Sequence, residues 1–181
     1  MVRGREGVAG ALLVGGASHR FGSPKALARL QGETLAERAH RVLVEACDEV
    51  IVVGKKDDGL QLPFPVLDDA SEIRAAIVGV AAGLRLAPCE LCLVLPTDMP
   101  WVTPGLLRGL ADRADGFDAA VPQTGPLPGA YRRSALPVLE RRIAAGDLAL
   151  HRALEELRTH VVDCDEALLG NVNVPSDLAP T

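Results

Sequence analysis

The stretch LLVGGASHRFGSPKAL, residues 12–27, gathers glycines and two long cations into one loop directly after an apolar run. Glycine lets backbone N–H groups approach an anion closely, because no Cβ stands in the way. The guanidinium of Arg20 and the ammonium of Lys25 add a forked donor and a point charge, which both suit phosphate oxygens. These residue types at this spacing predict a binding loop for a polyphosphate.

The spacing within this loop excludes two common nucleotide-binding motifs. A P-loop reads G-x-x-x-x-G-K-[ST], whereas here five residues separate Gly16 from Gly22 and Lys25 follows three positions later. The dinucleotide motif G-x-G-x-x-G does not occur in the chain. The loop therefore belongs to another class of phosphate-binding segment.

A carboxylate follows a second buried strand. Residues 91–95, LCLVL, are apolar throughout and the run breaks at Pro96, so Asp98 stands just beyond the strand. In open α/β sheets, ligands bind outside the carboxyl ends of parallel strands, which would bring Asp98 and the glycine-rich loop to one edge. Asp98 is a hard oxygen ligand of the kind magnesium prefers, although an aspartate here could instead begin a turn with Pro100.

Strands and helices alternate along the chain around these groups. Short apolar runs predict strands at residues 8–14, 49–54, 65–69, 91–95, 119–121 and 160–163. We expect one domain over residues 1–181, a three-layer, Rossmann-like α/β domain with a mostly parallel sheet.

Capping signals predict where the helices between these strands begin. Thr34 and Glu37 form a capping box before apolar positions at helical spacing from 35 to 46, and a second apolar helix face runs from Ile73 to Leu84. Thr103 and Pro104 suit the N-cap and first position of a third helix. A further helix is predicted with Ser134 as its cap, Pro137 in its first turn and Gly146 at its end, and another near residues 148–157.

Composition and charge narrow the possible partners. At 48% hydrophobic and 24% charged residues the chain reads as an ordinary soluble globular protein, and its net charge of −5 argues against a broad nucleic-acid or membrane surface. Residues 1–41 carry seven Arg and Lys against three Glu, a net +4 that leaves −9 for the rest. This asymmetry favours a small anionic ligand near the N-terminal end. With neither a membrane-length apolar run nor a secretory pattern, we expect a cytoplasmic protein.

The cysteines and histidines offer no convincing metal site. Cys89 and Cys92 form a C-x-x-C, but Cys92 lies inside a strand-like run and the second ligand pair of a zinc site is missing. We interpret this pair as small buried hydrophobes. The four histidines, His19, His40, His151 and His160, lack ligand spacing and are interpreted as structural or surface residues.

The opening loop resembles the GG-x-S-x-R-(M/F)-G-x-x-K segment of nucleotidyltransferases that activate sugars and cofactors. Its positions are filled by Gly15, Gly16, Ser18, Arg20, Phe21, Gly22 and Lys25. The segments PTDMP, LPGAYRRSALPVLERRIAAGD and NVNVPSDL follow in the order and at about the spacing of the molybdenum cofactor guanylyltransferases and their close relatives, the molybdopterin nucleotidyltransferases. The resemblance covers essentially the whole chain.

This resemblance implies an activity. GMP would pass from GTP to the terminal phosphate of molybdenum-loaded molybdopterin, with release of pyrophosphate, magnesium (Mg2+) as cofactor, and transient contact with proteins that insert the finished cofactor. The chemistry agrees, since a phosphate monoester has a second pKa of about 6 and is already an anion at neutral pH without a general base. What remains is to position the reactants and neutralise charge, for which Lys25, Arg20, loop amides and magnesium suffice.

The resemblance also implies roles for individual residues. Arg20, Lys25 and Asp98 would be catalytic, with Asp98 the metal ligand. The nucleotide would be bound by Leu13, Val14, Gly15, Gly16, Ser18, Gly22, Lys25, Asp69, Asp98, Asn171 and Asn173. Asp69 adjoins Asp68 and could equally be a loop or cap residue, and the two asparagines could be turn formers.

Two departures from the family pattern bear on the choice of base. Relatives commonly carry a G-P-L-A-G-like turn where this chain has residues 75–79, AAIVG, and an asparagine near the position of Val53. Both departures weaken GTP relative to CTP. The alternatives are therefore a CTP-dependent molybdopterin cytidylyltransferase, a sugar- or alcohol-phosphate nucleotidyltransferase, and a nucleotide- or cofactor-binding module without transfer, against which the presence of both Lys25 and Asp98 argues.

Overall fold

The apolar run after Gly7 forms strand β1 (Val8–Leu13), and every residue of this strand after Val8 is buried. The structure is a computed structural model that describes residues 7–15, 24–173 and 175–178. The other strands of its main sheet are β4 (Glu49–Gly54), β5 (Leu67–Asp68), β6 (Leu91–Pro96), β7 (Ala119–Pro122), β8 (Gly129–Arg132) and β9 (Thr159–Val162). Strands β2 (Arg29–Leu30) and β3 (Glu33–Thr34) form a separate antiparallel hairpin.

The main sheet has the order β5-β4-β1-β6-β8-β7-β9. β1 lies between β4 and β6 and is parallel to both, β5 is parallel to β4, and β9 is parallel to β7. Only β8 among these strands is antiparallel to its neighbours. The mostly parallel sheet is confirmed, and the chain changes direction across it between β1 and β6.

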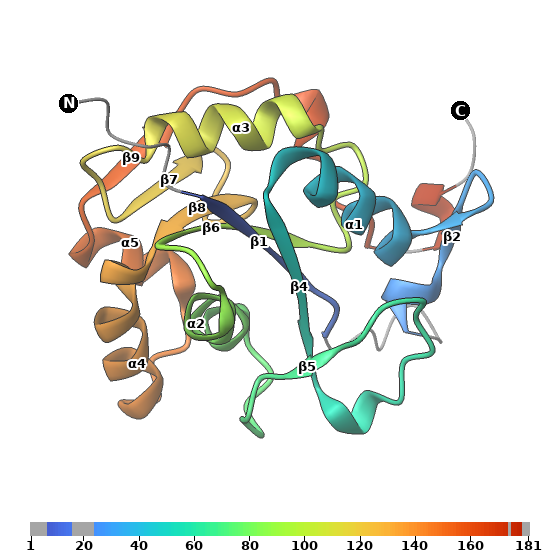
Figure 1. Ribbon diagram of the computed structural model, residues 1–181, viewed down its shortest axis with the longest axis horizontal. Coiled ribbons are helices and arrows are strands. Elements are labelled where there is room, and N and C mark those ends of the chain that lie inside the picture. Colours follow the sequence, from blue (N-terminus) through green and yellow to red (C-terminus); the bar gives the residue numbers. More distant parts are fainter. Residues whose placement is uncertain (1–6, 16–23, 174, 179–181) are drawn as a thin grey trace.

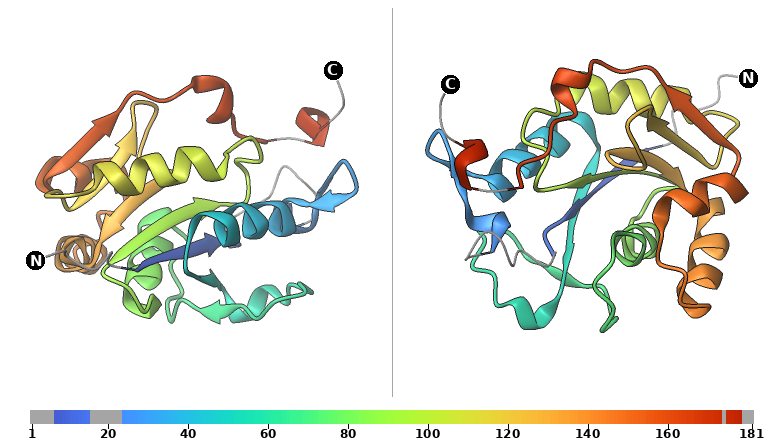
Figure 2. Two further views of the ribbon diagram at one scale, coloured as in Figure 1. Left: turned by 45° about the horizontal axis from the view of Figure 1, so that its top comes forward. Right: turned by 180° about the vertical axis from the view of Figure 1, so that it is seen from behind.

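Helices cover both faces of the sheet, giving the predicted three layers (Figure 1). The helices are α1 (Leu35–Ala46), α2 (Ala76–Leu86), α3 (Pro104–Arg113), α4 (Leu136–Ala144) and α5 (Leu150–Glu156). α2, α4 and α5 pack on one face and α1 and α3 on the other, each face enclosing its own cluster of buried aliphatic side chains. The views in Figure 2 show the sheet between these layers. Within the part of the chain that is described, no helix has the length and apolar character needed to cross a bilayer.

Two of the predicted helix starts are confirmed. The Thr34 hydroxyl accepts a hydrogen bond from the Glu37 backbone N–H at 3.1 Å, and the Glu37 carboxylate accepts one from the Thr34 N–H at 2.9 Å. This reciprocal capping box satisfies donors that the first turn of α1 leaves unpaired. Thr103 caps α3 by accepting from the Leu106 N–H, with Pro104 at the first position.

Two other helix starts differ from the prediction. α2 begins at Ala76, so Ile73 lies in the preceding loop, because its carbonyl is held by a lysine side chain and Ala75 is extended. Ser134 does not cap α4. It lies in a 3-10 turn before that helix, and its hydroxyl donates to the carboxylate of Asp118 at 2.6 Å. Tertiary contacts decide both starts.

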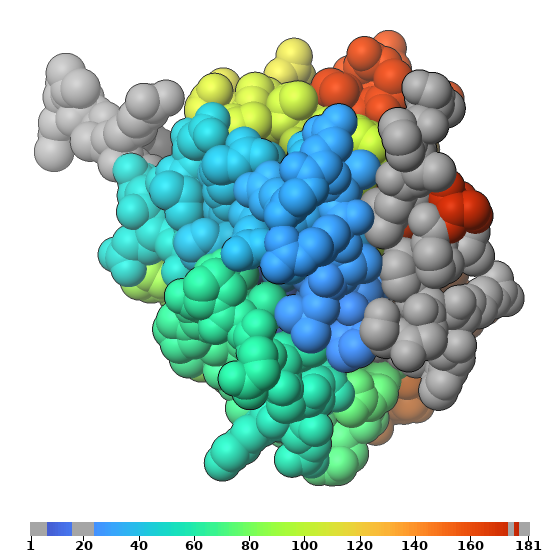
Figure 3. Space-filling model, turned by 90° about the vertical axis from the view of Figure 1, so that its right-hand side faces the viewer, coloured from blue at the N-terminus to red at the C-terminus, as the bar shows by residue number. Residues whose placement is uncertain are grey.

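The β2–β3 hairpin packs against α1 and the C-terminal part of the chain. Leu30 of the hairpin and Leu35 of α1 form a small buried cluster with Val172. In Figure 3 the blue surface of residues 24–34 adjoins the cyan surface of α1 and lies above the teal segment that follows β4. Lys25 therefore belongs to a segment that is anchored to both α1 and the C-terminal part of the chain.

Candidate active site

A cleft of about 420 Å³ opens at the carboxyl ends of β1, β4, β5 and β6. It lies where the strand order reverses, which is the usual ligand position in an open α/β sheet. Its volume is within the range of small-molecule sites. The Thr97 backbone N–H donates to the Leu13 carbonyl at 3.3 Å and so continues the β1–β6 contact beyond the strands. This contact fixes the turn that carries Asp98.

Asp98 lines this cleft and pairs with Lys25, 73 positions earlier in the chain, which is not itself among the described lining residues. The Lys25 ammonium lies 3.3 Å from Asp98 Oδ2, and the two side chains are 21% and 29% exposed. Lys25 begins a short 3-10 turn that is anchored by the buried Ala26. The structure therefore brings together two residues that the sequence assigns to one site.

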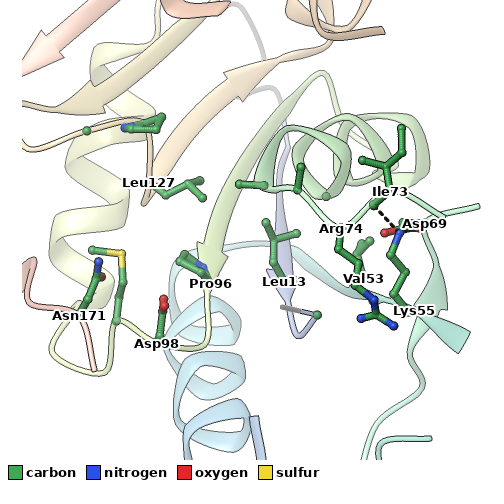
Figure 4. A pocket seen from close by; sticks show the side chains of 18 of the residues that line it. Leu13, Val53, Lys55, Asp69, Ile73, Arg74, Pro96, Asp98, Leu127 and Asn171 are labelled. Atoms are coloured by element: carbon green, nitrogen blue, oxygen red, sulfur yellow. Dashed lines mark hydrogen bonds and ion pairs between the residues drawn. The ribbon is translucent and has the colours of Figure 1, made fainter. Parts of the chain in front are cut away.

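Asn171 reaches the same cleft through its neighbour in the chain. The Val172 backbone N–H donates to the Asp98 carbonyl at 2.8 Å, while the Val172 side chain is buried. Asn171 lines the cleft beside Asp98 (Figure 4). Asn173 is exposed, its N–H donates to Asp177 Oδ2, and it is not among the described residues lining the cleft.

The end of β1 supplies backbone to the cleft. Leu13 and Gly15 line it, whereas the Val14 side chain is buried in the core and the Val14 N–H donates to the Val53 carbonyl at 3.0 Å. Any contact of Val14 with a ligand would therefore run through its main chain. The predicted site residues Gly16, Ser18, Arg20 and Gly22 lie outside the described residues.

Asp69 lies in the cleft wall with a partner that sequence reasoning missed. Its Oδ1 accepts hydrogen bonds from the Lys55 ammonium at 2.8 Å and from the Ser71 N–H at 3.0 Å. Lys55 donates further to the carbonyls of Ser71 and Ile73. Figure 4 shows Lys55, Asp69 and Ile73 together at one end of the cleft. The available signal was the position of Lys55 directly after the predicted strand at 49–54.

The opposite end of the cleft is formed by the loop 124–127, before β8. Thr124, Gly125, Pro126 and Leu127 line it. The hydroxyl of the fully buried Tyr131 donates to the Pro126 carbonyl at 2.6 Å, which holds the loop against the sheet. Neither histidine nor cysteine occurs among the described lining residues.

Residues 10–162 match the family described as "MobA-like NTP transferase domain". The chain belongs to this family. It is 36% identical to a "Probable molybdenum cofactor guanylyltransferase" from Chloroflexus aggregans, over 94% of this chain and 91% of that relative. It is 32% identical to a "Molybdenum cofactor guanylyltransferase" from Pseudomonas putida, over 92% of this chain and 93% of that one.

A solved family structure has the same architecture. It is "Molybdopterin-guanine dinucleotide biosynthesis protein A" from Archaeoglobus fulgidus, with a TM-score of 0.79, 28% identity and 94% of each chain covered. The resemblance to molybdenum cofactor guanylyltransferases and the nucleotidyltransferase fold expected from the sequence are both confirmed.

The two departures from the family pattern lie in the cleft wall. Val53 and Gly54 line it at the end of β4 without a polar side-chain group. Gly79 packs so closely that a Cβ there would lie 3.1 Å from Leu13 Cδ1, and Ala75 and Ala76 line the cleft beside it. The glycine retained from the family turn thus has a packing role, because it lets α2 lie directly against the end of β1.

A magnesium ion fits the donors at Asp98. The described residues contain no group of three or more His, Cys, Asp or Glu side chains able to hold a metal. Magnesium usually takes only one or two carboxylates from the protein and completes its shell with water and substrate phosphates. A single partly exposed carboxylate beside Asn171 suits such a shared ion.

The remaining candidate ligands have structural surroundings. Cys92 is fully buried and burial raises the pKa of its thiol, in agreement with its prediction as a small buried hydrophobe, whereas Cys89 is only partly buried. His40 stacks on Phe64 with ring centroids 4.3 Å apart, and burial lowers its pKa. His160 Nδ1 lies 3.0 Å from the Arg113 carbonyl.

Proposed function

We propose that the chain transfers GMP from GTP to the terminal phosphate of molybdenum-loaded molybdopterin, giving the guanine dinucleotide cofactor and pyrophosphate. The observation that carries this proposal is the pairing of Lys25 with Asp98, which lines a cleft of about 420 Å³ at the strand-order reversal. Family membership supports it, since the similar proteins from Chloroflexus aggregans and Pseudomonas putida bear the guanylyltransferase name.

The cleft divides into two parts about Asp98 (Figure 4). Gly15 and Asp69, which the family resemblance assigns to the nucleotide, lie with α2 and β4 on one side. Asn171 and the loop 124–127 lie on the other. We infer that GTP occupies the first part and the acceptor the second, so that the acceptor phosphate meets the α-phosphorus near Asp98.

The reaction needs charge neutralisation more than proton transfer. An oxygen of the acceptor phosphate forms a bond to the α-phosphorus, and the bond from that phosphorus to the α–β bridging oxygen breaks. Pyrophosphate leaves with the electron pair, and the Lys25 ammonium is placed to stabilise the charge that develops there. Because the acceptor phosphate is already an anion at neutral pH, a cleft without a histidine base is adequate.

The Lys25–Asp98 pair would open when the nucleotide binds. Both side chains are partly exposed and 3.3 Å apart, so breaking this one contact between Lys25 and Asp98 would cost little. Asp98 would then be released to hold magnesium, with Asn171 beside it. When bound, the ion would neutralise and orient the phosphates.

The proposal extends to the surroundings of the reaction. We propose that it takes place in the cytoplasm and that the product passes to cofactor-insertion proteins by transient contact. The charge asymmetry of the sequence supports an anionic small-molecule substrate rather than a nucleic acid.

A direct test offers the purified chain molybdenum-loaded molybdopterin, magnesium and each of GTP, CTP and ATP. Pyrophosphate release and dinucleotide product are measured for each nucleotide. We expect transfer with GTP, because a site that hydrogen-bonds one base edge rejects others at about 1–3 kcal/mol for each unsatisfied group. Preference for CTP would change the proposed activity from guanylyl transfer to cytidylyl transfer. No product with any nucleotide, using acceptor that another enzyme accepts, would overturn the proposal.

A further inference from the structure

The Lys55 ammonium is nearly buried, and all of its hydrogen-bond donors are used. Its side chain is only 11% exposed, and its three N–H donors have three acceptors: Asp69 Oδ1 at 2.8 Å and the carbonyls of Ser71 and Ile73. Asp69 is itself 7% exposed. Nothing in the transfer chemistry described above uses this ammonium.

We propose that Lys55 is a positioning residue that shapes the nucleotide part of the cleft. It ties the carboxyl end of β4 to the loop 69–75 and so fixes the wall against which the nucleotide binds. This inference rests on the proposed function for the identity of the ligand, but it concerns nucleotide affinity rather than the transfer step.

The loop 69–75 depends on this tie because it has little regular structure of its own. The last ladder contact to β4 is the Asp69 N–H donating to the Gly54 carbonyl, and Ala70 then takes a left-handed φ of +58°. α2 begins only at Ala76, after an extended Ala75 that provides no side-chain cap. Lys55 donates hydrogen bonds to two carbonyls within this stretch and thereby fixes the conformation of the segment that connects β5 to α2.

The segment that Lys55 holds forms a large part of the cleft wall. Asp69, Arg74, Ala75 and Ala76 all line the cleft on this side. Farther along α2, the close approach of Gly79 to Leu13 fixes the helix against β1. The wall is thus set at Gly79 by close packing, and at the loop 69–75 by the Lys55 ammonium together with the exposed Arg74–Asp58 ion pair. Loss of the ammonium would therefore loosen the loop end only.

The Lys55–Asp69 pair is closer and more deeply buried than the Lys25–Asp98 pair, and this difference indicates different roles. The former pair is 2.8 Å apart with side chains 11% and 7% exposed, against 3.3 Å with 21% and 29% for the latter. Opening the former would take the ammonium from the nearly buried Asp69 carboxylate, which would keep only the Ser71 N–H among its described donors, and this is costly. It therefore stays closed while nucleotide binds, and Asp69 acts through Lys55 and Ser71 on the shape of the wall.

Substitution of Lys55 by methionine tests the inference, since it keeps the length of the stem and removes the ammonium. We expect the KM for GTP to rise about 10- to 100-fold, as for the loss of a buried hydrogen-bonded charge, with kcat within about threefold of wild type. Backbone amide exchange should accelerate in residues 69–76 and stay unchanged in α1. The matched control is Lys56→Met at the adjacent, exposed position, where none of these changes is expected.

A second variant keeps the test informative if Lys55→Met folds poorly. Lys55→Arg retains a cation with several donors, and we expect a smaller rise in KM with unchanged kcat. Unchanged KM in both Lys55 variants would overturn the proposal. So would a fall in kcat at constant KM, which would make Lys55 part of the transfer chemistry.

Equilibrium binding of magnesium-GTP separates this inference from the proposed function. If the wild-type chain binds GTP but transfers nothing, the function fails while the Kd of each variant still tests Lys55. A Kd raised in Lys55→Met and unchanged in Lys56→Met would support the positioning role on its own. Equal Kd values for wild type and Lys55→Met would reject it.

Discussion

Asp98→Asn separates the stabilising and the chemical contributions of one carboxylate. The gross attraction between Lys25 and Asp98 at 3.3 Å is about 5 kcal/mol with an effective dielectric constant of about 20. Desolvation and solvent screening reduce the net value of partly exposed pairs to about 0–1 kcal/mol. We therefore expect the substitution to change the free energy of unfolding by at most about 1 kcal/mol.

The same substitution should affect magnesium use far more. Asparagine keeps the shape but removes the charge that would hold the ion, and loss of even an indirect partner of a metal commonly costs about 10- to 100-fold in affinity or activity. We expect the magnesium concentration for half-maximal pyrophosphate release to rise at least about tenfold and the rate to fall. Asp115→Asn, at a side chain 91% exposed, is the control. An unchanged magnesium titration with an unchanged rate would refute the reasoning and leave Asp98 a turn residue.

Three further predictions follow from the geometry. Lys25→Ala should lower turnover about 10²- to 10³-fold, as for removal of one preorganised electrostatic contact, and a rate within a few-fold of wild type would exclude Lys25 from the site. Gly129→Ala should destabilise the chain by about 1–3 kcal/mol in denaturant unfolding, because its Cβ would lie 2.5 Å from Tyr131 Cε2 and 2.8 Å from a backbone oxygen. Hydrogen bonds from Arg158 lower the pKa of Asp118 to about 2, so Asp118→Asn should cost about 1–2 kcal/mol at pH 7. The folded-state pKa is depressed, so this difference is present above about pH 4 and disappears as pH falls toward 2 in denaturation measured at several pH values.

The parts of the site that the sequence predicts are those governed by local rules. Apolar runs at β1 and β6 identify buried parallel strands, and the position of Asp98 just beyond β6 follows from the break at Pro96. The capping box of Thr34 and Glu37 fixes the start of α1 from four consecutive residues. The topology then requires the ends of β1 and β6 to meet, so Asp98 had to lie on the same edge of the sheet as Gly15.

Contacts distant in sequence decided what local patterns missed. Lys55 begins the run KKDD, which looks like solvated surface charge, and only the return of the chain at Asp69 buries it. Ser134 has the residue type of a helix cap, but Asp118 offers its hydroxyl a stronger acceptor. Asn171 and Asn173 are equivalent by motif, and the inward-facing Val172 between them with its bond to Asp98 brings the first to the cleft.

Charge pairing around the cleft bears on the proposed use of a magnesium-bound nucleotide. Lys25, Lys55 and Arg74 each face a carboxylate, respectively Asp98, Asp69 and Asp58. A bare triphosphate drawn to Lys25 would be brought beside the Asp98 carboxylate that Lys25 leaves, and the two anions would repel each other. If the triphosphate carried a divalent cation, the Asp98 carboxylate would attract that ion once the pair had opened. In the proposed function, exchange of Lys25 for magnesium at Asp98 would couple nucleotide binding to assembly of the charges that the transfer requires.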